Sequence, residues 1–308
     1  MAKVVVTGGA GFIGSHLADA LVARGDTVTI IDNLVTGKKE NIAHLLDRIV
    51  FIEGSILNDK DLERAFADAE IVYHQAAIPS VPKSVKDPFA SHEANATGTL
   101  KVLLAARDSG VKRVVYAASS SYYGDTPTLP KHEEMPANPL SPYAAQKYMG
   151  EAYAKQFFEL YGLETVALRY FNIFGPRQDP KSEYAAVVPK FITLMKARVR
   201  PTIFGDGTTT RAFTYVSDAV EANILAGEAK GIAGQAFNIA GGGQTSLNEL
   251  VTAINSVLDT MLEPEYTAPR PGDIKHSYAD ISKAERAFGF SPKVTLEEGL
   301  RRTAETLK

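Results

Sequence analysis

Near its start the chain reads Thr7-Gly8-Gly9-Ala10-Gly11-Phe12-Ile13-Gly14, between an apolar run and a helical segment. The run Val4–Thr7 is rich in β-branched residues, as strands are, whereas Ile13–Arg24 has the composition of a helix. Glycines allow a sharp backbone turn and let a pyrophosphate approach main-chain N–H groups, and the positive end of a helix dipole favours the same anion. The stretch therefore predicts a phosphate-binding turn between a strand and a helix.

A second strand-like run, Thr27–Asp32, ends in an acid about 20 residues after the glycines, as the dinucleotide-binding fingerprint requires. In that fingerprint the carboxylate accepts hydrogen bonds from the adenosine ribose. Because the negative charge of Asp32 repels a 2′-phosphate, the sequence predicts NAD rather than NADP as the cofactor. Taken alone, Asp32 is also consistent with a solvated strand end.

Strand-like and helical segments go on alternating through the first half of the chain. This alternation predicts an α/β protein with a Rossmann-type, doubly wound parallel sheet that carries helices on both faces. Further expected strands are Ile49–Glu53, Ile71–His74, Arg113–Ala117 and Thr165–Arg169, and further expected helices are Asp59–Ala67 and Thr97–Ser109.

After Gly175-Pro176-Arg177 the pattern changes, because prolines and glycines interrupt shorter elements. A strand-like run, Ala236–Ala240, ends in three glycines, and a helix is expected from Ser246. We therefore expect a second, smaller α/β domain for the substrate. The predicted division is 1–172 with about 213–241 for the dinucleotide-binding domain, and 173–212 with about 242–308 for the substrate domain.

The composition excludes several classes of function. The 308 residues include 33 basic and 36 acidic side chains without a long basic run, so we expect no nucleic-acid partner. There is no cysteine for disulfide or thiolate chemistry, and the six histidines form no zinc motif, so no metal site is expected. No apolar run is long enough to span a bilayer, and the early first strand leaves no room for a signal peptide. The expectation is a cytoplasmic protein that binds no membrane.

Catalytic candidates lie near the fifth expected strand. Tyr143 and Lys147 are four residues apart in a helix that Ser141 can cap and Pro142 can begin, so they share one helix face. A cation beside a phenol favours the phenolate, which makes Tyr143 a candidate general base. The strand ends in Ser119-Ser-Ser121-Tyr-Tyr-Gly124, and parallel sheets bind ligands at such carboxyl ends. Without the other motifs, this would be an ordinary serine-rich strand end.

The glycine spacing, the serine-rich strand end and the Tyr-x-x-x-Lys pair together resemble the extended short-chain dehydrogenase/reductase superfamily. His74-Gln-Ala-Ala77, Ser80-Val-Pro-Lys-Ser84 and Arg169-Tyr-Phe-Asn172 narrow the resemblance to its nucleotide-sugar 4-epimerases, which act on UDP-glucose or UDP-N-acetylglucosamine. The resemblance implies an isomerase that oxidises C4 of the sugar transiently to a ketone and returns the hydride to the other face. It implies Ser119, Tyr143 and Lys147 as the catalytic residues.

The resemblance also implies two binding sites. The NAD site comprises Gly8, Gly11, Phe12, Ile13, Gly14, Asp32, Asn33, Ser55, Ile56, Gln75, Ala76, Ala77, Tyr143, Lys147 and Tyr170. The UDP-sugar site comprises Ser80, Ser120, Ser121, Asn172, Val188, Phe204, Arg211, Arg270, Asp273 and Ser277.

Some positions depart from the family pattern. Ser55 stands where the family usually has an Asp near the adenine, Ala212 replaces an acid after Arg211, and Lys83 stands where Arg is frequent. Alternatives within the superfamily are a dehydratase or another nucleotide-sugar epimerase, and an alternative outside catalysis is an NAD-binding protein. Dehydratases and decarboxylases carry an extra acid where this chain has Ser120 and Ser121, which disfavours both.

The resemblance places Ser277 near the C2 substituent of the sugar, where glucose-restricted members carry a bulky residue. Because serine is small, we expect the N-acetylated pair of sugars to be accepted beside UDP-glucose and UDP-galactose. The resemblance further implies a homodimer formed through the helices Thr97–Ser109 and Tyr143–Tyr161.

Overall fold

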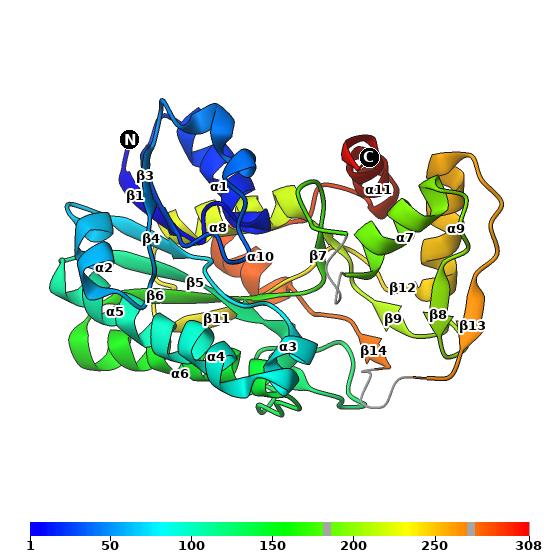
Figure 1. Cartoon of the computed structure of the whole chain (residues 1–308). Coiled ribbons are helices and arrows are strands. Elements are labelled where there is room, and N and C mark those ends of the chain that lie inside the picture. Colours follow the sequence, from blue (N-terminus) through cyan, green and yellow to red (C-terminus); the bar gives the residue numbers. More distant parts are fainter. Residues whose placement is uncertain (181–185, 270–274, 308) are drawn as a thin grey trace.

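The computed structural model describes residues 1–180, 186–269 and 275–307. Within them, a large parallel sheet carries helices on both faces, and a smaller region lies beside the carboxyl ends of its strands (Figure 1). The predicted α/β class and doubly wound sheet are therefore confirmed.

The main sheet sets the place where ligands can bind. Its order is β11-β6-β5-β4-β1-β2-β3, so the chain builds outward from β1 in one direction and from β4 in the other. The crevice at the carboxyl ends of β1 and β4 is the usual ligand site of such a sheet. The strands are β1 (Lys3–Thr7), β2 (Thr27–Asp32), β3 (Val50–Glu53), β4 (Ile71–His74), β5 (Arg113–Ser119), β6 (Glu164–Tyr170) and β11 (Gln235–Ile239).

Both faces of this sheet are buried, as the apolar strands require. Along β1, Val4 and Val6 belong to the core on one face and Val5 to the core on the other. The first face is covered by α1 (Phe12–Ala23), α8 (Val216–Glu228) and α10 (Ser282–Phe288). The second is covered by α2 (Asp59–Phe66), α5 (Gly98–Asp108) and α6 (Pro142–Tyr161), with the short helices α3 (Val81–Lys86) and α4 (Pro88–His92) and a π-helical turn (Glu93–Thr97) beside them.

The smaller region has its own apolar core, which also packs against Phe12 and Ile13 at the start of α1. Ser246 caps its central helix in a capping box with Glu249, as the predicted helix start requires. Its helices are α7 (Val187–Lys196), α9 (Leu247–Leu258) and α11 (Leu296–Thr306). Its short strands are β8 (Thr202–Phe204), β9 (Thr210–Arg211), β12 (Thr245–Ser246), β13 (Glu265–Thr267) and β14 (His276–Ser277). A separate two-stranded sheet is formed by β7 (Ile173–Phe174) and β10 (Thr214–Tyr215).

The structure differs from the expected division at one place. Helix α10 packs on β11, and Ala284 and Phe290 join the core of the main sheet rather than that of the smaller region. The physical reason is that β11 is the last strand of the sheet and needs cover on this face. Across the described ranges, no helix is long and apolar enough to cross a membrane, and no cluster of three potential metal ligands occurs.

Candidate active site

The glycine turn approaches the strand end beside it very closely. Gly8 has a φ of +69°, and a Cβ at this residue would lie 2.7 Å from the backbone of Ala76. At Gly14 a Cβ would lie 2.2 Å from the Gly8 carbonyl oxygen, so only glycine fits the first turn of α1. Gly11 begins this helix, and no described side chain caps the N–H groups that follow it. The turn therefore offers free main-chain donors to an anion.

Asp32 lies at the carboxyl end of β2, next to the glycine turn. One carboxylate oxygen accepts a hydrogen bond from the Leu34 N–H at 2.8 Å, and the other accepts one from the Ala10 N–H at 3.0 Å. Burial raises the pKa of Asp32, and the two backbone donors oppose that rise. The carboxylate is thus fixed in place beside the predicted phosphate site.

Ser55 follows β3 and contacts a carboxylate from α2. Its backbone N–H donates to Asp61 Oδ2 at 3.0 Å, and its hydroxyl accepts from the Leu57 N–H. Asp61 therefore brings a carboxylate from α2 to the strand end where the family usually has one. Nearby, Asn33 is exposed, and Ile56 packs against Gly98 at the start of α5.

The three catalytic candidates come together at the carboxyl end of β5. Ser141 caps α6 and Pro142 begins it, as predicted, so Tyr143 lies in its first turn. Burial raises the pKa of Tyr143, whereas a hydrogen bond with the Ser119 side chain lowers it. Ser119 also accepts a hydrogen bond from the Ser121 hydroxyl at 2.8 Å, at the start of the 3₁₀ turn Ser120–Tyr123. The serine turn and the helix thus meet at the phenol.

Lys147 is buried one turn further along α6. Its ammonium lies 4.7 Å from the centre of the Tyr116 ring, and the Tyr116 hydroxyl donates to the Lys147 carbonyl oxygen at 3.2 Å. Burial lowers the pKa of Lys147 to about 7. Lys147 was expected to depress the pKa of Tyr143, but burial outweighs every other influence on this phenol and raises its pKa. Tyr116 was missed from the sequence because an aromatic residue within an apolar strand resembles ordinary core.

His74 links the first and fourth strand ends. Its Nδ1 lies 2.7 Å from Thr7 Oγ1 and its Nε2 lies 3.0 Å from Thr99 Oγ1. Burial, with Lys147 nearby, lowers the pKa of His74 to about 3, so the ring is neutral. Thr7 also accepts the backbone N–H of Ala76, the middle residue of the Gln-Ala-Ala stretch after β4. His74 therefore holds the shape of the crevice and is not a charged group.

Gln75 and Tyr170 meet above the sheet through a residue that the sequence did not reveal. Asn223 of α8 donates to the Tyr170 hydroxyl at 2.7 Å and accepts from the Gln75 amide at 2.9 Å. Burial raises the pKa of Tyr170 to about 12. Nothing near Asn223 in the sequence marks it, because its role depends on where α8 crosses β4 and β6.

Across the crevice, Arg211 and Ser277 are register partners in the parallel pair of β9 and β14. Their side chains therefore share one face of this small sheet. The other face carries Thr210 and His276, whose side chains lie 2.8 Å apart in a hydrogen bond. Arg211 also donates to the Thr210 carbonyl oxygen at 2.8 Å. Arg211, predicted to bind the diphosphate, and Ser277, predicted to lie near the sugar, are thus neighbours.

The other predicted substrate residues divide between the crevice and the core. Asn172 has a φ of +40° and donates to the Ala212 carbonyl oxygen at 3.1 Å, at the chain's entry into the smaller region. Phe204 is partly exposed at the end of β8, and Ser80 caps α3. The side chain of Val188 is buried in the core, so only its backbone in the first turn of α7 could meet a ligand. Arg270 and Asp273 lie outside the described residues.

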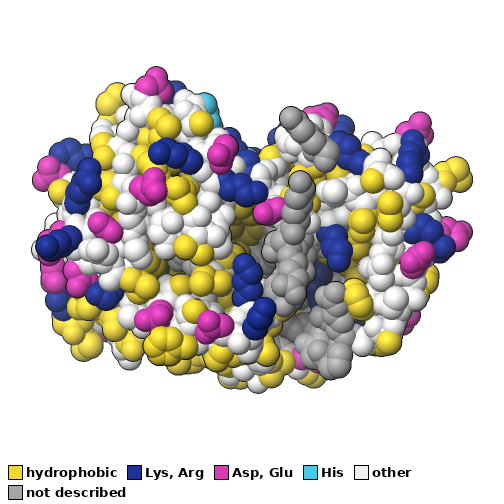
Figure 2. Space-filling model, in the orientation of Figure 1, with side chains coloured by type: hydrophobic (Ala, Val, Ile, Leu, Met, Phe, Trp, Pro, Cys, Tyr) yellow, Lys and Arg dark blue, Asp and Glu magenta, His cyan; other side chains and the backbone are white. Residues whose placement is uncertain are grey.

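The molecule is hollowed between the main sheet and the smaller region. Figure 2 shows Lys and Arg side chains around this hollow. Cationic side chains around a cleft attract an anionic ligand such as a nucleoside diphosphate.

Comparison with known proteins places the chain in a family. The sequence profile of the NAD dependent epimerase/dehydratase family matches residues 4–240. The chain belongs to this family. A putative UDP-glucose 4-epimerase of Methanocaldococcus jannaschii is 42% identical over 308 residues, covering 99% of this chain and 98% of that protein.

Solved structures of family members agree over the whole fold. A UDP-N-acetylglucosamine 4-epimerase of Methanobrevibacter ruminantium, in complex with UDP-N-acetylmuramic acid, is 44% identical with a TM-score of 0.95, covering 99% of this chain and 97% of that one. A UDP-glucose 4-epimerase of Thermotoga maritima, with UDP-glucose, is 40% identical with a TM-score of 0.94, covering 99% and 98%.

The family cofactor, NAD, fits the residues of this chain. A Cβ at Gly8 or Gly14 would clash with the protein's own backbone, so these glycines permit the tight turn that a pyrophosphate-binding loop requires. Asp32 stands at the end of β2, where a ribose carboxylate partner belongs, and Lys147 and Tyr143 stand at the end of β5. The predicted use of NAD therefore agrees with both the family and the site.

Proposed function

We propose that this member of the family is a UDP-hexose 4-epimerase. The observation that carries the proposal is the meeting of Ser119, Tyr143 and Lys147 at the end of β5, beside the glycine turn at the strand-order reversal. A hydroxyl, a phenol and a buried ammonium at that place suit removal of a proton from a sugar hydroxyl. The 4-epimerase names of the relatives described above support the same reaction.

In the proposed reaction, Tyr143 takes the proton of the sugar 4-hydroxyl and later returns it. Ser119 donates a hydrogen bond to the oxygen at C4, which becomes a ketone between the two half-reactions. When bound, NAD supplies the hydride acceptor and then the hydride donor for C4. The keto-sugar turns over while its UDP stays anchored, so the hydroxyl returns with inverted configuration.

Lys147 is the cation that can stabilise the ionised form of Tyr143. Burial alone raises the pKa of Tyr143, so the phenolate requires a nearby cation. Lys147 lies one turn away on the same helix face, and its own pKa of about 7 leaves it partly protonated near neutral pH. We therefore assign to Lys147 both the support of the phenolate and a hydrogen bond to the cofactor ribose.

The neighbours of Ser119 favour epimerisation over elimination. A 4,6-dehydratase needs an acid and a base beside the triad hydroxyl, and a decarboxylase of this superfamily needs a glutamate there. Here Ser120 and Ser121 occupy those places, and the Ser121 hydroxyl donates to Ser119. Neither serine has a carboxyl group that could serve as the extra acid or base.

For the sugar, we propose that the acetylated pair, UDP-N-acetylglucosamine and UDP-N-acetylgalactosamine, is interconverted beside the UDP-glucose pair. Ser277 supports this because its small side chain shares a sheet face with Arg211, which offers a guanidinium fork to the diphosphate. A roomy pocket admits the larger sugar without rejecting the smaller one, since one missing group costs only about 1–3 kcal/mol.

The direct test incubates the purified protein separately with UDP-glucose and UDP-N-acetylglucosamine and resolves the products. We expect both to be epimerised. Ser277→Tyr should abolish turnover of the acetylated sugar and spare UDP-galactose, whereas Ser277→Ala should keep both. If the unmodified protein refuses acetylated sugars, residue 277 does not set the pocket. If neither UDP-sugar is converted, the epimerase proposal itself is wrong.

We also infer a homodimer formed through α5 and α6. Apolar side chains are exposed along α6, including Met149, Leu160 and Tyr161, and the ring of Tyr161 carries the Arg107 guanidinium of α5 at 5.0 Å. Exposed apolar side chains on α6, beside the neighbouring helix α5, suit an isologous four-helix contact. Met149→Glu should dissociate the dimer in sedimentation, whereas Met261→Glu, at an exposed site in the smaller region, should not. A monomeric parent protein would contradict the dimer.

A further inference from the structure

Arg169, on β6, forms an ion pair with α6, the helix that carries Tyr143 and Lys147. Its Nε donates to Glu151 Oε2 at 2.9 Å and its Nη2 donates to Oε1 at 2.5 Å, in a fork that is almost fully buried. Glu151 follows Tyr143 and Lys147 at four-residue steps, so all three share one face of α6. The bidentate pair therefore fixes that face of α6 against the sheet.

The remaining nitrogen of the same guanidinium, Nη1, binds the turn that follows Ser119, the third catalytic candidate. Arg169 Nη1 donates to the Tyr123 hydroxyl at 2.7 Å, and that hydroxyl donates to Asn238 Oδ1 at 2.6 Å. The guanidinium also lies 3.6 Å from the centre of the Tyr122 ring. Tyr122 and Tyr123 end the 3₁₀ turn that Ser119 caps, so the turn cannot shift without breaking these contacts.

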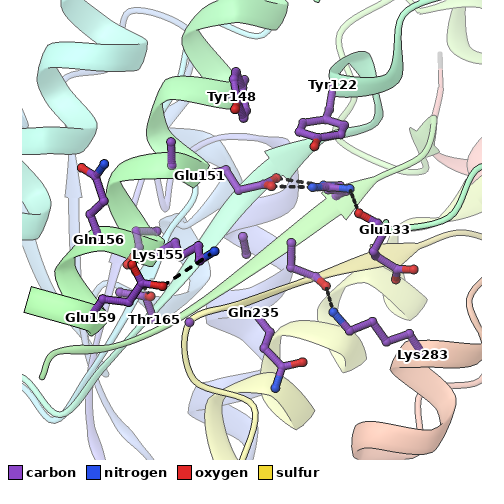
Figure 3. A pocket seen from close by; sticks show the side chains of 16 residues that line it. Tyr122, Glu133, Tyr148, Glu151, Lys155, Gln156, Glu159, Thr165, Gln235 and Lys283 are labelled. Carbon is purple, nitrogen blue, oxygen red and sulfur yellow. Dashed lines mark hydrogen bonds and ion pairs between the residues drawn. The ribbon is translucent and has the colours of Figure 1, made fainter. Parts of the chain in front are cut away.

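Figure 3 shows the part of this arrangement around Glu151 and Tyr122, seen in the groove of about 590 Å³ between α6, β6 and β11. Glu151 and Tyr122 point toward the same spot, with Glu133 beside them, and the two parallel dashed lines from Glu151 mark its bonds to the Arg169 fork. The residues that line this groove do not include Ser119, Tyr143 or Lys147. Arg169 therefore acts from beneath the site and does not face a substrate.

We propose that Arg169 is a positioning residue, which sets the distance between Ser119 on its turn and Tyr143 on α6. The inference rests on the proposed function, because it gives this distance a role in proton transfer. Bidentate guanidinium pairs fix both distance and orientation, which an ammonium does not. One buried side chain thereby makes the two halves of the triad a single rigid unit.

A loosened turn has a defined chemical consequence. Ser119 lowers the pKa of Tyr143 through their hydrogen bond, so a longer contact leaves the phenol harder to ionise. The other groups that face Tyr143 are Lys147 on its own helix and Tyr116 on β5, and His74 lies beyond Lys147 on β4. None of them contacts Arg169 directly, so a change there should reach Tyr143 through Ser119.

The test uses variants that keep most of the packing. Replacing Arg169 by Met would leave Glu151 buried without a partner and strongly destabilise the fold, so Arg169→Lys and Tyr123→Phe are the primary variants. We expect kcat to fall about 10–100-fold, since small misplacements of catalytic groups cost that much. KM for the UDP-sugar should stay within twofold of the parent value, and the acid limb of the kcat–pH profile should move to higher pH.

Two controls separate positioning from stability. Arg113→Lys alters another buried Arg–Glu fork, that of Arg113 with Glu164 at the opposite end of β5 and β6, and should lower the melting temperature without moving kcat or the pH limb. Tyr122→Phe removes a hydroxyl but keeps the ring under the guanidinium, and should leave kcat unchanged. If Arg169→Lys and Tyr123→Phe behave like Arg113→Lys, the proposal is overturned.

The link through Arg169 can also be tested by measuring stability, which does not depend on enzyme activity. Glu151→Gln and Tyr123→Phe should be coupled in the free energy of unfolding, and the coupling should vanish when Arg169 is already Lys. If the losses in unfolding free energy simply add in the parent background, the proposal that Arg169 links Glu151 and Tyr123 is contradicted. An inactive parent protein would instead contradict the proposed function, so the two failures remain distinguishable.

Discussion

The two ends of the main sheet are built from the same strands but differ in how completely their buried charges are paired. At the amino ends, Arg113 of β5 pairs with Glu164 of β6 at 2.5 Å. Its guanidinium also donates to three carbonyl oxygens at the end of α8, those of Ala226, Gly227 and Ala229. At the carboxyl ends, Arg169 pairs with Glu151, whereas Lys147 is buried without an ion pair among the described residues, and burial raises the pKa of Tyr143.

This difference indicates that the amino end stabilises the fold and that the carboxyl end carries the catalytic site. A buried charge with partners costs little, whereas one without partners is destabilising until a ligand supplies what is missing. The amino end is therefore complete in the free protein, and the carboxyl end is completed by cofactor and substrate. Perturbed titratable groups gathered in one crevice are typical of a catalytic site.

The largest expected effect is on turnover at the carboxyl end. Tyr143→Phe should keep the fold and NAD binding but lower kcat about 10²–10⁴-fold, because it removes the general acid and base. The measurement is steady-state epimerisation with the fold checked by circular dichroism. Near-normal turnover in a folded variant would remove Tyr143 from the mechanism and with it the contrast between the two ends.

At the amino end, Arg113→Met should act on stability alone. Three carbonyl oxygens and a carboxylate lose their donor, so we expect the free energy of unfolding to fall by about 1–3 kcal/mol. Denaturant unfolding measures this loss, and kcat per folded molecule should equal that of the parent protein. A specific loss of kcat would mean that the amino end also contributes to catalysis.

The pH dependence of stability sharpens the contrast further. Since burial lowers the pKa of Lys147 to about 7, well below the ordinary lysine value of about 10.4, the unfolded chain binds the extra proton between these values. The free energy of unfolding of the NAD-free protein should therefore rise as the pH rises through this window. Lys147→Met should lose that slope, while Arg113→Met should keep it. Equal slopes in all three proteins would show that Lys147 is not desolvated.

The smallest effect is expected at Tyr73 on β4. Its hydroxyl is buried close to Gly227 of α8 and has no hydrogen-bond partner in the part of the chain that the structure describes, and burial raises its pKa. Tyr73→Phe removes this unsatisfied group, so we expect the protein to gain up to about 1 kcal/mol of stability with unchanged kcat. Thermal unfolding measures the gain, and a clear loss would indicate a bound water at the hydroxyl.

The carboxyl end was the part of the molecule that sequence patterns predicted best. The glycine turn, Asp32 and the Tyr143–Lys147 pair are local signals, since each depends on a few residues at fixed spacing. The strand boundaries were off by one or two residues where a strand continues into its functional end, as β5 does to Ser119. Such ends carry polar residues, which hide them from an apolar pattern.

Contacts between distant segments could not be predicted. Asn223 reaches Gln75, and Asp61 brings its carboxylate to Ser55, only because of the way helices cross the sheet. Val188 was assigned to the ligand by resemblance, but its side chain belongs to the core of the smaller region. The assignment of α10 to that region differs from the structure for the same reason, because cover for β11 is a property of the folded sheet.

The position of β11 also has a consequence for how the protein is made. β11 pairs with β6, yet about 65 residues of other structure separate the two in the chain. At about 5–20 residues per second, a ribosome releases β6 roughly 3–13 s before its partner strand exists. During that interval the apolar edge of β6 is open to any other strand. The nascent chain is then most prone to aggregate, and a messenger that slows translation after β6 should lower the yield of folded protein.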